Sequence, residues 1–190
     1  GLSFGATEKK MGWNAQPTAQ VIMEDCKVSE KNRVGAEGEG FKFAMSGLDG
    51  GRINIGACSL GGAQKALKAS IKYTSERKQF GKLISDFQNT EFMLADMATE
   101  LEASRMMIYR GADMIDKGMA NVSAACAMAK RYSTDMCSKI ADNALQLHGG
   151  YGYLSEYEIE QIVRDLRVHQ ILEGTNQIMR VIISRSLLRQ

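Results

Sequence analysis

The chain has 190 residues, of which 44% are hydrophobic and 24% charged, a balance that allows one substantial core and gives no sign of disorder. Its 24 basic and 22 acidic residues are dispersed and leave a formal charge of +2, which disfavours a nucleic-acid partner. No run approaches the roughly eighteen uninterrupted apolar residues that a membrane helix needs, so no membrane span is predicted.

The first 40 residues have the character of a β-rich unit. Segment 20–28 mixes branched and polar residues as a strand does, and the glycine-rich stretch GAEGEG at 35–40 predicts a turn that closes it. One strand cannot form a sheet, so its partners are expected upstream in a longer chain. The sequence therefore predicts two domains, the end of a β-domain at 1–40 and a helical domain at 41–190.

Helical periodicity dominates after residue 41. Helices are expected at about 43–77, 86–117, 121–147, 156–165 and 176–188. The second has a mostly apolar face made by Leu94, Met97, Leu101, Ser104, Ile108 and Ile115. The third has a stripe of smaller residues that suits close helix approach. Four long helices and a minor one at 156–165 predict a mainly α fold, a four-helix up-and-down bundle.

Three other kinds of site are disfavoured. A di-metal centre in a bundle uses Glu-x-x-His pairs, but Leu145 and Leu166 stand three positions before the two histidines, so no metal site is expected. The glycines of HGGYGY at 148–153 do not follow a strand, as a Rossmann fingerprint would. The four cysteines form no C-x-x-C pair and are expected to be inert core thiols: Cys26, Cys58, Cys126 and Cys137.

Three stretches carry a family resemblance, in matching order and spacing. They are ERKQFGKLISDFQ at 76–88, LQLHGGYGYLSEYEIEQIVRD at 145–165 and ILEGTNQIMR at 171–180. Together they resemble the acyl-CoA dehydrogenase family in its carboxy-terminal portion. The leader MEDCKVSEKNRVGAEGEGF at 23–41 is similar to that family's exit from its middle β-domain. The resemblance thus covers essentially the whole chain and implies the family's helical carboxy-terminal domain.

The resemblance also implies a reaction. A base removes the α-proton of an acyl thioester, and the β-hydrogen leaves as hydride to a flavin. In the family the base is usually the glutamate of an E-G-T motif, which is Glu173 in this sequence, followed by Gly174 and Thr175. Other members carry the base on the first helix just before an arginine. Here that position is Gly51, before Arg52, so the alternative base is absent.

The resemblance further assigns residues to the cofactor FAD and to the CoA ester. Its FAD contacts fall on Arg77, Phe80, Phe87, Gln88, Gln146, Gly149, Gly150, Thr175, Asn176 and Gln177. Its substrate contacts fall on Asp49, Arg52, Gly174 and Arg185. A cation such as Arg77 suits the pyrophosphate, and glycines let the backbone approach a cofactor.

Each of these motifs also has a simpler structural interpretation. The E-G-T stretch can be a turn with Thr175 or Asn176 as a helix cap. Arg77 can be an ordinary solvated charge at a helix end, and HGGYGY a turn that ends a helix. Asp49 and Arg52 can be a helix-terminal charge and its surface partner.

The stretches at 47–64 and 167–188 most resemble the branch of the family that takes a short branched acyl-CoA in valine breakdown. The resemblance then implies electron-transfer flavoprotein as acceptor, a homotetramer built through helical bundles, and the mitochondrial matrix. Two alternatives remain open. The chain can be a structural oligomerisation module that binds no cofactor unaided, or part of an acyl-CoA oxidase, which passes electrons to oxygen.

Overall fold

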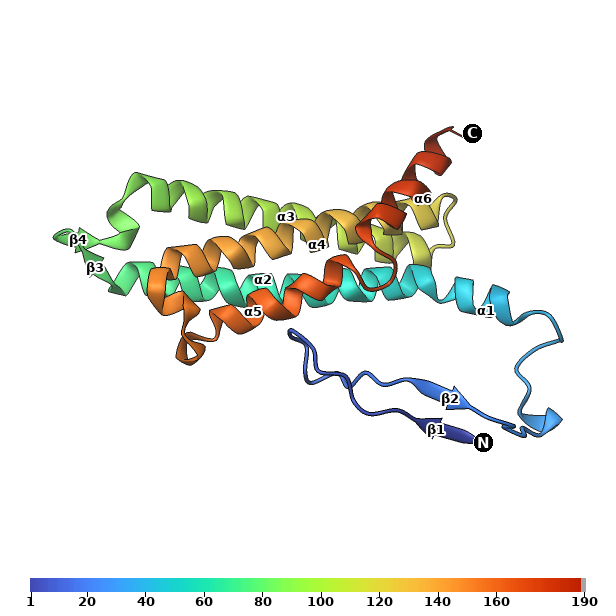
Figure 1. Cartoon of the computed structure of the whole chain (residues 1–190). Helices are drawn as coiled ribbons and strands as arrows, with labels where there is room; N and C mark the ends of the chain where they lie inside the picture. Colours follow the sequence, from blue (N-terminus) through green and yellow to red (C-terminus); the bar gives the residue numbers. More distant parts are fainter. Residues whose placement is uncertain (189–190) are drawn as a thin grey trace.

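The computed structural model of the chain describes residues 1–188 (Figure 1). The helices are α1 (Gly40–Ser46), α2 (Leu48–Glu76), α3 (Gln88–Asp116), α4 (Val122–His148), α5 (Ile159–Arg167) and α6 (Asn176–Leu188). Two short antiparallel pairs supply the strands, β1 (Leu2–Phe4) with β2 (Val21–Met23) and β3 (Lys78–Gln79) with β4 (Lys82–Leu83). Residues 189–190, the end of the predicted helical domain, lie outside the described part.

Helices α2, α3 and α4 pack against one another along most of their length and run alternately up and down (Figure 1). The apolar stripe of α3 faces inward, since Met97, Leu101 and Ile108 are buried, while Ile115 at its end is exposed. Small residues let α4 approach both neighbours, among them Cys126, Ala129 and Ala144. The mainly α fold class predicted from periodicity is confirmed.

The helix that completes the bundle differs from the expected one. Helix α5, predicted as the minor helix, lies against both α2 and α4 and adds Ile159, Ile162 and Leu166 to the shared core. Helix α6 contacts α4 and projects from the end of the bundle (Figure 1). Length was a poor guide because the buried face, and not the number of turns, decides which helix joins a core.

Two glycines permit the close packing of α2 on α3. A Cβ added to Gly56 would overlap the Ile108 side chain, and one added to Gly111 would overlap Ile53. Each helix therefore places a large residue where the other has none. This interdigitation brings the two helix axes together without a void.

The leader forms a hairpin, which corrects the expectation of a strand without partners. β1 pairs antiparallel with β2 in the register Leu2–Met23, and both strands remain largely exposed. The turn between them docks on α5, because the Arg164 guanidinium donates to the Met11 carbonyl at 2.9 Å and the Trp13 N–H donates to Asp165. Residues 11–13 are therefore held against the helical part of the chain.

A tight hairpin follows α2. The helix ends at Glu76, and Phe80 and Gly81 both take positive φ, 53° and 82°, at the turn between β3 and β4. Gly81 lies within the turn, where a glycine takes a positive φ without strain. The hairpin lies at the opposite end of the bundle from α6 (Figure 1).

The cysteines divide into two kinds. Cys126 and Cys137 are buried, and burial raises the pKa of Cys126 to about 11 and that of Cys137 to about 12, as expected of inert core thiols. Cys26 and Cys58 are exposed, so the expectation of core thiols was wrong for these two. Cys26 lies beyond the hairpin, and Cys58 lies on the outer face of α2. The small or apolar residues next to them in the sequence do not indicate which side of a helix or loop faces solvent.

Among residues 1–188 no cluster of His, Cys, Asp or Glu could hold a metal ion. Nor does any helix in this part combine the length and apolar character that crossing a bilayer requires.

We expect Ile140→Ala to lower the free energy of unfolding of the chain by roughly 2–5 kcal/mol, because Ile140 is 1% exposed at the centre of the core and truncation leaves a cavity. The control is Ile71→Ala on α2, where the side chain is 47% exposed and little burial is lost. Urea unfolding of both variants measures the difference. Equal losses at the two positions would contradict this packing.

Candidate functional site

The predicted base, Glu173, lies on a loop between the short 3-10 turn η5 (Val168–Gln170) and α6. Glu173 has φ 53° and Gly174 has φ 90°, so two consecutive residues take the left-handed region that L side chains rarely adopt. Thr175 then caps α6, its hydroxyl accepting from the Ile178 N–H at 3.4 Å. The expected cap is therefore present, but it follows a strained turn instead of an ordinary one.

The Glu173 carboxylate lies directly against Gly51 on α2. A Cβ added at Gly51 would overlap this carboxylate, so the glycine gives the acid its room. Positions 51 and 173 are the two at which the resemblance allows a base. The structure places them in contact although 122 positions separate them in the sequence.

A cavity of about 590 Å³ opens beside Glu173. Its walls come from the leader loop (residues 10–18), α2, α5, η5 and the base loop (residues 171–175), and are mainly apolar: Met11, Trp13, Ile55, Val168, Ile171 and Leu172. Lys10, Arg164 and Arg167 also line it. An apolar cavity with one carboxylate at its wall suits an acyl chain that is to lose a proton.

The wall behind Trp13 is built on a buried histidine. His169 packs edge-on to the Trp13 ring with centroids 5.1 Å apart, and its Nδ1 lies 2.8 Å from the Ser59 hydroxyl. Burial lowers the pKa of His169, which favours the neutral ring at pH 7. This contact joins the leader loop, η5 and α2 into one wall.

Lys130, a fully buried lysine on α4, is a site residue that no sequence motif indicated. Its ammonium donates to the Gly174 carbonyl at 2.9 Å and to the Asn176 side-chain oxygen at 2.8 Å. Burial lowers the pKa of Lys130 to about 8, with the neighbouring Asp135 and Glu173 carboxylates acting in the opposite direction. The sequence signal was a charge within the stripe of small residues on α4, four positions after Cys126 and three before Ser133.

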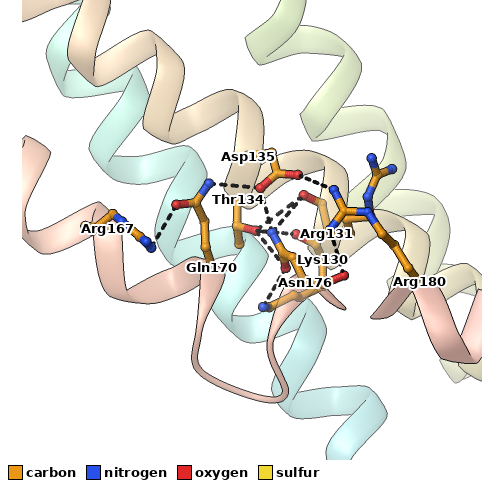
Figure 2. A network of polar contacts seen from close by, with 8 residues as sticks. All are labelled: Lys130, Arg131, Thr134, Asp135, Arg167, Gln170, Asn176 and Arg180. Atoms are coloured by element: carbon orange, nitrogen blue, oxygen red, sulfur yellow. Dashed lines mark hydrogen bonds and ion pairs between the residues drawn. The ribbon is translucent and has the colours of Figure 1, made fainter. Parts of the chain in front are cut away.

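Asp135 on α4 binds the residues on both sides of the base loop, Gln170 before it and Asn176 after it (Figure 2). One of its carboxylate oxygens accepts from the Gln170 amide at 2.9 Å and from the Asn176 amide at 2.7 Å. The Asn176 amide nitrogen also donates to the Thr134 hydroxyl at 3.0 Å. Asn176, predicted as an FAD contact, is thus 4% exposed and lies inside the protein, whereas Gln177 beside it is exposed.

The predicted substrate contacts are only partly brought together. Arg52 is buried and pairs with Asp49 at 2.7 Å, and Asp49 also accepts from the Ser123 hydroxyl. This pair lies next to Gly51 and hence near the base. Its ion pair is internal, so the surface-partner interpretation of Arg52 does not fit its burial. Arg185 is exposed in the last turn of α6 and is not part of this ion pair.

A second group of predicted residues lies at the hairpin end of the bundle. The Arg77 guanidinium stacks 5.1 Å from the centroid of the Tyr151 ring. Phe80 is 92% exposed and meets Phe87 edge-on. The remaining members are exposed, with open space around both glycines: Gln88, Gln146, Gly149 and Gly150.

The length of α2 keeps the two groups apart. Its 29 residues make a helix roughly 40 Å long, with Gly51 and the base near one end and Arg77 at the other. One extended dinucleotide cannot reach both ends. The structure therefore does not bring all the predicted FAD contacts together within one chain.

A family model described as acyl-CoA dehydrogenase, C-terminal domain, matches residues 38–188. The mitochondrial isobutyryl-CoA dehydrogenase of Bos taurus is 53% identical over the whole of this chain, which covers 46% of the bovine protein. A subunit of the caffeyl-CoA reductase–Etf complex of Acetobacterium woodii is 47% identical, again over the whole chain and 50% of that subunit.

Among solved structures, butyryl-CoA dehydrogenase from Megasphaera elsdenii superposes with a TM-score of 0.96 at 40% identity. The match covers all of this chain and 49% of that one. The chain thus spans about half the length of the relatives it matches.

The buried lysine makes stability depend on pH. The folded pKa of Lys130, about 8, lies below its ordinary value of 10.5, so between these pH values the unfolded chain binds more protons than the folded one. The contribution of Lys130 to the free energy of unfolding should therefore rise with pH from about 8 to 10.5, by roughly 3 kcal/mol.

Chemical unfolding of the wild type and of Lys130→Met across this range isolates the effect, because tyrosine and cysteine titrations are common to both. The stability difference between the two proteins should change in favour of the wild type as pH rises. A constant difference from pH 7 to pH 10.5 would mean that Lys130 keeps an ordinary pKa.

Proposed function

The chain belongs to the acyl-CoA dehydrogenase family, and we propose that it supplies the catalytic base, Glu173, of an FAD-dependent enzyme that oxidises acyl-CoA esters between Cα and Cβ. The single observation that carries the proposal is the Glu173 carboxylate at the wall of the 590 Å³ apolar cavity. The E-G-T motif places a glutamate there in sequence, and Gly51 leaves space for it.

The proposed step is general base catalysis. The Glu173 carboxylate takes the α-proton of the bound thioester and becomes a neutral acid, while negative charge develops on the thioester oxygen. That oxygen needs hydrogen-bond donors. The Glu173 N–H has no hydrogen-bond acceptor among residues 1–188, so it is free to serve as one of them.

The exposed features at the hairpin end fit a flavin dinucleotide. Arg77 forms no ion pair within the described residues, and a pyrophosphate would give it one. Phe80 offers an uncovered ring, and the open backbone at Gly149 and Gly150 permits close approach. When bound, FAD supplies the hydride acceptor for the β-hydrogen.

We propose that two copies of the chain share each FAD, since the hairpin end and the base are too far apart to reach it within one chain. This arrangement supports a homotetramer in which Gln177 and Thr175 of one copy and Arg77, Phe80, Phe87, Gln88 and Gln146 of another approach the same cofactor. Exposed apolar side chains on α3 and α6 suit such contacts, among them Phe92, Tyr109, Leu187 and Leu188.

The proposed substrate is isobutyryl-CoA, oxidised to methacrylyl-CoA in valine catabolism. The bovine relative that bears this activity in its name, at 53% identity over the whole chain, supports it. That relative is mitochondrial, which supports the mitochondrial matrix as the location.

We assign the CoA side of the ester to the Asp49–Arg52 pair, to Gly174 and to Arg185, which lie on α2, the base loop and α6.

The proposed electron acceptor is electron-transfer flavoprotein. The Acetobacterium woodii relative belongs to a complex whose name includes Etf, which supports this acceptor over oxygen.

The proposed domains of the chain are the end of a β-domain at 1–40 and a helical domain at 41–190. The exposed apolar residues of the β1–β2 hairpin support it, because a two-stranded sheet needs a further layer to cover them.

An oligomerisation module without catalysis is the second candidate for the chain by itself. Two observations favour it. The cavity walls in this chain come from α2, α5 and the loops. The matched relatives are about twice as long as this chain, so it corresponds to only half of each of them. Flavin titration of the isolated chain separates the two candidates, since a module without a cofactor gives no stoichiometric flavin absorbance.

In the native full-length protein, Glu173→Gln should bind FAD and isobutyryl-CoA normally but reduce its flavin at least about 100-fold more slowly, because the near-isosteric amide cannot accept the α-proton. Anaerobic mixing with isobutyryl-CoA, followed by flavin absorbance, measures the rate.

The matched control is Glu156→Gln, an exposed acid on the 3-10 turn η4 (Ser155–Tyr157), which should bleach at the wild-type rate. Unchanged bleaching in Glu173→Gln would show that another group is the base.

Arg77→Ala should weaken flavin retention, raising the dissociation constant roughly 10- to 100-fold, because it removes a charge-assisted hydrogen bond to the pyrophosphate. The thermal midpoint of the flavin-free protein should change little, since Arg77 is not a core residue. Arg110→Ala, an exposed arginine on α3, is the control. Equal flavin content in the two variants after dilution and filtration would return Arg77 to a solvated-surface role.

A further inference from the structure

The base loop has a strained backbone conformation, and few hydrogen bonds within the loop itself stabilise it. Glu173 at φ 53° takes a conformation that is strained for an L residue and persists only where its surroundings hold it in place. The loop's backbone bonds are local, since the Ile171 and Leu172 N–H groups both donate to the Val168 carbonyl at the end of α5. Something outside the loop must hold the turn that follows.

Within the described residues, Lys130 is the sole group outside this segment that donates a hydrogen bond to residues 171–174, since the Ile178 and Met179 N–H groups donate only to Thr175. It reaches the Gly174 carbonyl at 2.9 Å, one peptide after the base. Its second acceptor, the Asn176 side-chain oxygen, lies at the first residue of α6. One ammonium therefore ties both the turn and the start of the next helix to α4.

The orientation of Asn176 is fixed on both sides. Its oxygen faces the Lys130 ammonium, and its nitrogen faces the Asp135 carboxylate (Figure 2). If the Asn176 amide were flipped, its NH2 group would face the Lys130 ammonium and its oxygen would face the Asp135 carboxylate. Both contacts would then be unfavourable. Because Asp135 also binds Gln170 before the loop, α4 holds the chain on both sides of Glu173.

Stability alone does not explain a lysine at this position. Burying an ammonium completely is costly, and an apolar side chain of the same length would avoid that cost. The neighbouring charges, Asp135, Glu173 and the second buried cation Arg52, do not give Lys130 a direct ion pair. What Lys130 provides and an apolar residue cannot is a pair of directed hydrogen bonds.

We propose that Lys130 is the positioning residue of the catalytic base: its bonds to Gly174 and Asn176 fix the left-handed turn that aims the Glu173 carboxylate past Gly51 into the cavity. The inference rests on the proposed role of Glu173 as the base. Lys130 touches neither substrate nor cofactor and acts through the backbone. Its contribution is orientation, to which proton transfer is sensitive because a displacement of about 1 Å can cost 100-fold in rate.

The test uses Lys130→Met in the native full-length, flavin-loaded protein, since methionine has similar length without donors. The first readout is exchange of the α-hydrogens of acetyl-CoA in D2O, which needs the base but not hydride transfer because acetyl-CoA has no β-carbon. The second is the rate of flavin reduction by isobutyryl-CoA. Both rates should fall roughly 10- to 100-fold, with flavin content and KM for isobutyryl-CoA changed less than about twofold.

Two further variants sharpen the result. Lys139→Met makes the same change at an exposed position on α4 and should leave both rates unaltered. Lys130→Gln keeps an N–H donor on a shorter side chain, so both of its rates should lie between those of the wild type and Lys130→Met. The glutamine variant also serves as the test if Lys130→Met folds poorly.

The outcomes separate two failures. Exchange and flavin reduction at wild-type rates in Lys130→Met and Lys130→Gln would overturn the positioning role while leaving Glu173 as the base. Parallel losses of flavin, substrate affinity and rate would overturn it too, by showing a general structural role. Absence of exchange and bleaching in the wild type would instead reject the proposed function, and the positioning role with it.

Discussion

The hydrogen bonds of the buried Lys130 ammonium connect the bundle to the loop that carries Glu173. Helix α4 is the central element, since α2, α3, α5 and α6 all pack on it, and its position is set by small residues that allow close approach. A donor fixed on such a helix has a fixed place in space. The rigid core thereby supplies the reference against which a strained, two-residue left-handed turn is held.

The same bundle sets distances as well as orientations. Helix α2 carries Gly51, against which the base lies, near its start and Arg77 at its end, and no side-chain movement shortens a continuous helix. The residues predicted to contact FAD consequently lie on helix ends and loops at both ends of the bundle. The proposed sharing of one cofactor between copies rests on this geometry more than on any single contact.

Particular residues show how far sequence reasoning reaches. The helix ranges were predictable because apolar residues recur at the helical period and glycines mark their ends, as at Gly118. The glutamate of the E-G-T stretch was identifiable because the motif is local. Lys130 and Asp135 were not, since their partners lie about 40 positions away and their own neighbourhood on α4 is typical of an ordinary helix. The hairpin pairing of β1 with β2 was missed because each strand has only three residues, largely exposed, and so leaves little pattern in the sequence.

The sequence by itself determined the mainly α class, the family and the glutamate that we propose as the base, because periodicity and short motifs are properties of adjacent residues. Tertiary structure alone decided that α5 and not α6 completes the core, that Asn176 points inward, and that Gly51 faces Glu173. Each of these depends on which surfaces meet when helices pack. That choice is made by the burial and hydrogen bonding of residues far apart in the chain, which no local pattern records.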